Sequence, residues 1–69
     1  MKLDLHGVRH ENVRPVLHSH IYHNPPPFEV ITGNSMKMQE IVLDVLKEHG
    51  LGHFYRNSGS LVVLEKSID

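Results

Sequence analysis

The sequence has no cysteine. Without cysteine, the chain cannot form a disulfide framework, a cysteine-ligated zinc site or a thiol nucleophile. Small secreted domains usually depend on disulfides, so the absence of cysteine favours the reducing environment of the cytoplasm. Residues 1–6 also lack the apolar run that a signal peptide requires. We therefore expect a cytoplasmic protein.

Long hydrophobic runs and a large excess of charge are missing as well. The longest apolar run, residues 61–64, is far shorter than the ~20 residues that span a bilayer, so no membrane partner is expected. Seven Lys and Arg residues against eight Asp and Glu residues give a formal net charge of −1. Proteins that hold duplex nucleic acid by bulk charge are far more basic, so any contact with nucleic acid must be local.

The residues that are present suit one small globular domain. A chain of 69 residues leaves no room for a second domain, and 39% apolar residues are too many for a disordered chain. We therefore assign residues 1–69 to a single domain. The compositional oddity is the set of seven histidines, which add positive charge as the pH falls toward ~6.

Apolar periodicity predicts the order strand, helix, strand, helix, strand, strand. The expected strands cover residues 2–5, 28–32, 53–56 and 61–65, and the expected helices cover residues 9–22 and 36–49. Pro15 is tolerated only in the first turn of a helix, so it predicts that the first helix begins between residues 11 and 14. We expect Ser35 to cap the second helix and Gly50 to end it in a left-handed conformation.

Residues 61–64 are apolar throughout, which indicates a central strand rather than an edge strand. We therefore expect the last strand to insert beside the second. Right-handed crossovers would then place both helices on one face of a mixed four-stranded sheet. The expected architecture is a two-layer α/β (α+β) sandwich with the order βαβαββ.

Residues 3–7 (Leu-Asp-Leu-His-Gly), followed by a helix, resemble the LDLHG signature of the small MutS-related (Smr) domain family. A second signature of that family, His-Gly-x-Gly or Thr-Gly-x-Gly, opens its second helix. Residues 32–35 (Thr-Gly-Asn-Ser) stand in its place, with Ser35 where the second glycine would fall. Residues 59–64 are similar to the family's final segment, in which a glycine precedes a strand.

The resemblance implies a fold like that of the C-terminal domain of translation initiation factor 3. It also implies nucleic-acid binding and, in some members, endonuclease (nicking) activity on DNA or RNA, in DNA repair or RNA processing. Branched, single-stranded or structured nucleic acid is the expected partner, because no recognition helix for a duplex is evident. No cofactor is expected, and a requirement for a divalent metal stays open.

The expected topology brings the loops after the first and second strands to one end of the sheet, where both helices begin. Helix N-termini carry unpaired amides and a partial positive charge, which suit an anion such as phosphate. Glycines in both loops allow a close approach of the backbone. The candidate nucleic-acid-binding residues are Gly7, Arg9, Arg14, Thr32, Gly33, Asn34, Ser35 and Lys37.

Asp4 and His6 are the candidate catalytic residues. Two positions apart on a strand, they would share one face, with His6 as general acid or base and Asp4 orienting it or binding a cation. The alternative is structural: Asp4 caps the loop and His6 holds the turn. Cleavage is therefore an expectation separate from binding. The alternative function is a non-enzymatic protein-interaction module with the same fold.

Three histidines on the first helix, His18, His20 and His23, invite a zinc site. His18 would point away from the other two, and no cysteine or carboxylate completes the set, so we expect no metal there. Phe54 and Tyr55 should face opposite sides of their strand. We expect Phe54 in the interior and Tyr55 exposed, as a surface on which a base could stack.

Overall fold

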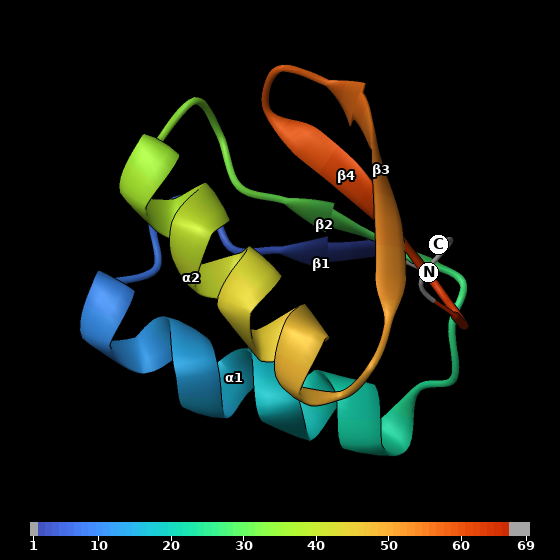
Figure 1. Ribbon diagram of the computed structural model, residues 1–69. Coiled ribbons are helices and arrows are strands. Elements are labelled where there is room, and N and C mark those ends of the chain that lie inside the picture. The colour runs from blue at the N-terminus through green and yellow to red at the C-terminus, as the bar shows by residue number, and fades with distance from the viewer. Residues whose placement is uncertain (1, 67–69) are drawn as a thin grey trace.

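The computed structural model describes residues 2–66 of the chain (Figure 1). All six expected elements are present in the expected order, with ends that differ by at most one residue from the predicted ranges. The strands are β1 (Lys2–Asp4), β2 (Phe28–Ile31), β3 (Gly52–Asn57) and β4 (Ser60–Leu64), and the helices are α1 (His10–His23) and α2 (Met36–Glu48). Neither helix is long and apolar enough to cross a membrane.

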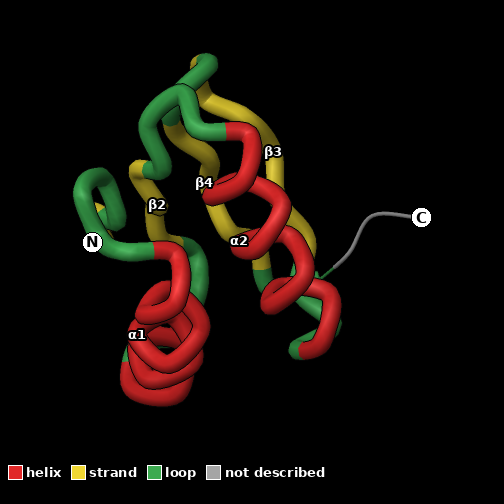
Figure 2. Tube along the Cα trace, turned by 90° about the vertical axis from the view of Figure 1, so that its left-hand side faces the viewer, coloured by secondary structure: helices red, strands yellow, loops and turns green. Residues whose placement is uncertain are grey.

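The four strands form one sheet in the order β1-β2-β4-β3. β1 runs parallel to β2, whereas β4 runs antiparallel to both β2 and β3. β4 is therefore a central strand beside β2, as its apolar run predicted. Figure 2 shows both helices on the same side of this sheet. The expected two-layer α/β sandwich is confirmed.

The core lies between the helices and the inner face of the sheet. Because side chains alternate along a strand, Phe28 and Val30 point inward from β2, where they lie opposite Val63 and Leu61 of β4. The rest of the buried apolar cluster comes from the β1–α1 loop and the two helices: Leu5, Val13, Leu17, Met38, Val42, Val45 and Leu46. Each fully buried Val or Leu stabilises the fold by about 1.5–3 kcal/mol.

α1 begins earlier than Pro15 predicts. The helix starts at His10, so Pro15 lies in its second turn, and the predicted start between residues 11 and 14 is wrong. A proline at this position removes the bond from its own nitrogen to the carbonyl of Glu11. Both Glu11 and Pro15 are exposed, so water can satisfy that carbonyl while Val13 and Leu17 hold the helix against the core.

α2 begins and ends as its sequence predicted. The Ser35 hydroxyl accepts a hydrogen bond of 3.1 Å from the amide of Met38, which satisfies one of the free amides of the first turn. At the other end, Gly50 has a φ of 68°, the left-handed conformation that glycine adopts most readily. These two signals fix where α2 starts, and therefore where its N-terminus lies relative to β2.

Candidate functional site

The loops that follow β1 and β2 lie in contact at one end of the sheet. Because β1 and β2 are parallel, their carboxyl ends meet there, and the amide of Leu5 donates to the carbonyl of Ile31 at 2.8 Å. A Cβ atom added to Gly33 would lie 3.4 Å from Cδ2 of His6. The imidazole of His6 thus rests on the backbone of the second loop, which joins the two loops into one surface.

The turn between β3 and β4 is the third part of this surface. The amides of Thr32 and Gly33 both donate to the carbonyl of Gly59, at 2.9 and 3.0 Å. The side-chain amide of Gln39 donates to the carbonyls of Gly33 (3.2 Å) and Ser58 (3.0 Å), which fastens the turn to α2. We call the surface formed by residues 6–10, 33–37 and 57–59 the rim.

Both helices begin at the rim. Nε2 of His10, the first residue of α1, lies 3.5 Å from the hydroxyl of Ser35, which caps α2. The N-termini of the two helices, each with a partial positive charge, therefore face the same surface. His10 was not among the candidate residues of the site. Its position opposite Ser35 depends on how α1 packs against α2, for which the sequence offers no local signal.

Asp4 and His6 do not share a face of β1, because β1 ends at Asp4 and His6 lies in the loop beyond it. Oδ1 of Asp4 accepts a hydrogen bond of 2.9 Å from the backbone amide of His6, so Asp4 shapes the loop. Within residues 2–66, no hydrogen bond joins the Asp4 carboxylate to the imidazole. Both side chains are exposed. This arrangement matches the structural alternative, in which Asp4 caps the loop. It leaves the imidazole of His6 accessible to a ligand.

Thr32 lies under the rim rather than on it. Its side chain is only 3% exposed, and its hydroxyl donates to the carbonyl of Gly33 at 2.8 Å, with the Gly59 carbonyl at 3.3 Å. Thr32 therefore fixes the second loop against the β3–β4 turn, and its hydroxyl is not presented to a ligand. The glycine that follows it has a φ of 68°, which turns the chain toward α2.

The expected cations divide into two groups. Arg9 and Lys37 are exposed on the rim, and Arg9 makes an ion pair of 3.4 Å with Glu11, which is also exposed. Arg14 lies away from the rim, between the helices. Its guanidinium donates to Asp44 (2.8 Å) and Glu48 (2.9 Å) of α2, and these two carboxylates raise the pKa of Arg14. Arg14 therefore ties α1 to α2 instead of joining the other candidate residues.

Two shallow, open hollows flank the rim. One, of about 380 Å³, includes Gly33, Asn34 and the β3–β4 turn. The other, of about 440 Å³, is formed by residues 8–11. The hydroxyl of Ser60 lines the first hollow, is buried, and has no hydrogen-bond partner among residues 2–66. Hollows this open suit the backbone of a polymer better than a small enclosed ligand.

His18, His20 and His23 of α1 have separate surroundings. Nδ1 of His18 lies 2.8 Å from Nε2 of His49, and Nδ1 of His23 lies 2.9 Å from the carbonyl of Ser19. The ring of His20 packs edge-on against Phe28, and burial lowers the pKa of His20. Among residues 2–66 there is no group of three His, Asp or Glu side chains that could hold a metal ion.

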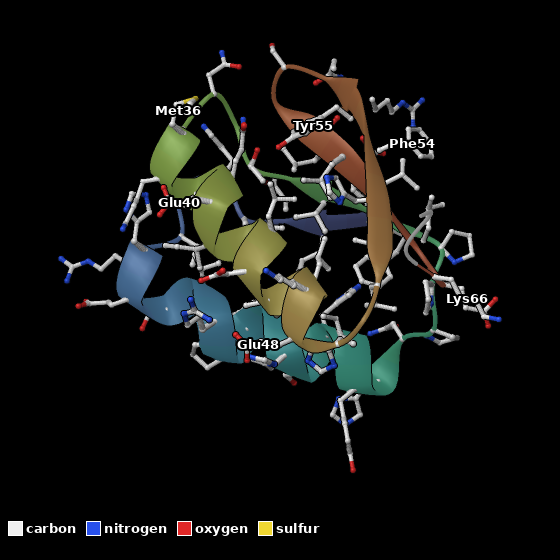
Figure 3. The ribbon with its side chains drawn as sticks, viewed as in Figure 1. Met36, Glu40, Glu48, Phe54, Tyr55 and Lys66 are labelled. Carbon is white, nitrogen blue, oxygen red and sulfur yellow. The ribbon has the colours of Figure 1, made fainter. Side chains whose placement is uncertain are left out.

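Both aromatic residues of β3 are half exposed, at 50% for Phe54 and 47% for Tyr55. The expectation that Phe54 lies in the interior is wrong. Phe54 pairs with Val62 and shares its face of the sheet, which is the face opposite the helices (Figure 3). Tyr55 points to the helix side but lies at the sheet edge, where its ring contacts His53 at 5.7 Å between ring centres.

Comparisons with known proteins found no match: no family model matches the chain, and no curated protein or solved structure is significantly similar to it.

Proposed function

We propose that the rim binds phosphate groups of nucleic acid. The proposal rests on the approach of His10, the first residue of α1, to Ser35, the cap of α2, because it places two helix N-termini at one surface. Amides of a helix's first turn point outward along its axis and carry the positive end of its dipole, so they favour an anion. A rim with two such ends can hold a phosphate without a high net charge on the whole protein.

The side chains of the rim add positive charge where the proposal needs it. Arg9, which directly precedes α1, and Lys37, in the first turn of α2, are both exposed cations. Asp44 and Glu48 of α2 pair with Arg14 away from the rim, and the acidic residue beside the rim, Glu11, pairs with Arg9 at 3.4 Å. The contact is therefore local, as the net charge of −1 requires.

The open shape of the rim favours a branched, single-stranded or structured nucleic acid. Its two hollows are shallow, and the exposed face of α2 carries Glu40, Asp44 and Glu48, whose negative charge disfavours entry into the major groove of a duplex. Contacts from backbone amides and cations to phosphates carry little sequence information, so we expect binding without strong sequence preference. The resemblance of residues 3–7 to the Smr signature supports the same partner.

Cleavage is the second part of the proposal. The imidazole of His6 is exposed beside Gly33, where it can act as general acid or base on a phosphate held by the rim. Asp4 contributes by holding the loop that carries His6. Nicking that is lost in His6→Ala but retained in Asp4→Asn would support these roles. Nicking that survives His6→Ala would exclude His6 as the catalytic group.

Titration with single-stranded, duplex and branched oligonucleotides tests binding. We expect Arg9→Ala and Lys37→Ala each to weaken binding, and each to reduce the salt dependence of affinity by about one counterion. Lys66→Ala is the matched control, because Lys66 is exposed at the end of the molecule opposite Met36 and the rim (Figure 3). Equal affinity in all three variants would contradict the proposal.

The alternative is a protein-interaction module that does not bind nucleic acid. The net charge of −1 and the pairing of Arg14 with two carboxylates favour this alternative. Contacts to phosphate are strongest at low salt. If none of the three oligonucleotides binds under that condition, the result supports the protein-interaction module.

A further inference from the structure

A second surface, separate from most of the rim, lies along β3. β3 is an edge strand of the sheet, so alternate backbone N–H and C=O groups along it face away from the sheet (Figure 2). Its residues 53–57 are all exposed. Natural edge strands are usually blunted by charged residues, proline, a bulge or a covering element. In β3 the only charged residue, Arg56, and the irregularity both lie at one end, so residues 52–55 carry neither device.

An apolar groove opens beside the regular half of β3. Its volume is about 370 Å³, and it lies between the last turns of α2 and the start of β3. The lining is mainly aliphatic and includes no carboxylate: Leu43, Leu46, Lys47, Gly50, Leu51 and His53. A strand added to the edge of β3 would therefore turn alternate side chains toward this groove.

β3 also presents two adjacent, half-exposed aromatic side chains. Phe54 lies on the open face of the sheet and Tyr55 on the helix side. Single exposed apolar residues are common on protein surfaces. Aromatic residues are enriched at the centre of protein interfaces, and here two of them lie on an unpaired edge next to an apolar groove.

We propose that β3 pairs antiparallel with β3 of a second copy of this chain, which joins the two four-stranded sheets into one. A twofold axis perpendicular to the sheet keeps each face on its own side, so opposite residues point the same way. With Phe54 on the axis, the two Phe54 rings meet on the open face. Tyr55 then lies opposite His53 of the second copy, where its ring enters that copy's groove.

The sequence of β3 favours this register over its neighbours. With His53 on the axis, Phe54 would lie opposite Gly52, which has no side chain to contact it. With Tyr55 on the axis, Phe54 would pair with Arg56, where the register of β3 shifts. A net charge of −1 per chain opposes the association only weakly.

The molecular mass in solution tests the pairing. In sedimentation equilibrium, the average mass should rise with concentration from 7.9 kDa toward twice that value. Phe54→Ser and Tyr55→Ser should each weaken self-association about tenfold or more. Tyr22→Ser is the matched control, because Tyr22 is 86% exposed on α1, away from the edge, and its removal should change nothing. Circular dichroism establishes that each variant is folded.

A mass that stays at 7.9 kDa at every concentration would overturn the proposal and leave the groove for another occupant. Equal weakening by Tyr22→Ser would overturn it too. The register has its own test, since the chain lacks cysteine. Residues opposite each other on an antiparallel pair lie at disulfide distance, so mild oxidation should link Phe54→Cys into a dimer but not Tyr22→Cys. Equal linking of the two variants would contradict this arrangement.

Discussion

Gly33 adopts a backbone conformation that few other residues tolerate. Its φ of 68° lies in the left-handed region, and a Cβ there would just touch the ring of His6. We expect Gly33→Ala to lower the free energy of unfolding by about 1–2 kcal/mol, because of the backbone strain. Gly59→Ala is the control, since its Cβ would also have a neighbour at 3.4 Å but its φ is not positive. Equal losses in urea denaturation would show that crowding, not conformation, sets the cost.

His20 makes the stability of the fold sensitive to acid. Burial lowers its pKa below the ordinary value of 6.5, so the folded chain resists protonation that the unfolded chain accepts. The free energy of unfolding should therefore fall as the pH drops below 6.5. His20→Phe should reduce this loss in urea titrations at several pH values, because it removes the proton uptake. His23→Phe, at an exposed position, is the control, and the same pH dependence in wild type and His20→Phe would contradict this assignment.

Some residues of the candidate site had roles that the sequence could not reveal. Arg14 looked like a rim cation, but its partners Asp44 and Glu48 are 30 and 34 positions away. Thr32 looked accessible, but the β3–β4 turn covers it. In each case the deciding contact comes from a distant segment. By contrast, the left-handed conformation of Gly50 and the cap at Ser35 are local properties, and the capping rules predicted them.

At the scale of elements, the sequence was most informative where local signals and burial agree. α2 has a cap, a continuous apolar face and a terminal glycine, and its predicted range differs from the structure by one residue. The start of α1 was harder to predict, because the rule that restricts proline to the first turn considers only the hydrogen bonds within the helix and not its packing. Packing of Val13 and Leu17 and the exposure of Pro15 outweigh the missing hydrogen bond.

The first turn of α2 serves both stability and the proposed binding, and Ser35 separates the two. Ser35→Ala removes the cap, so we expect a loss of about 1 kcal/mol in the free energy of unfolding. Ser35→Asp keeps a capping oxygen and should retain stability, but its negative charge faces the rim. Oligonucleotide binding should therefore weaken more in Ser35→Asp than in Ser35→Ala. The reverse order, measured by titration at low salt, would exclude the N-terminus of α2 from the contact.

At the scale of the whole molecule, two parallel strands and two helix starts converge at one end, while both aromatic residues of β3 lie along one edge (Figure 3). The convergence was predictable, because parallel strands followed by helices on one face must begin those helices at the same end. The third loop of the rim follows from β4 inserting antiparallel beside β2, which puts its first residue next to Ile31. Predicting the position of this loop required the register between β2 and β4 as well as the strand order.

The most direct measurement of the proposed function is amide chemical-shift perturbation during titration with a single-stranded oligonucleotide at low salt. If the two helix N-termini hold a phosphate, the perturbed amides will cluster in residues 6–10, 33–37 and 57–59, and the shifts will decrease as salt is added. Perturbation centred instead on β3 and the last turn of α2, or the absence of any salt-sensitive shift at the rim, would contradict the proposal.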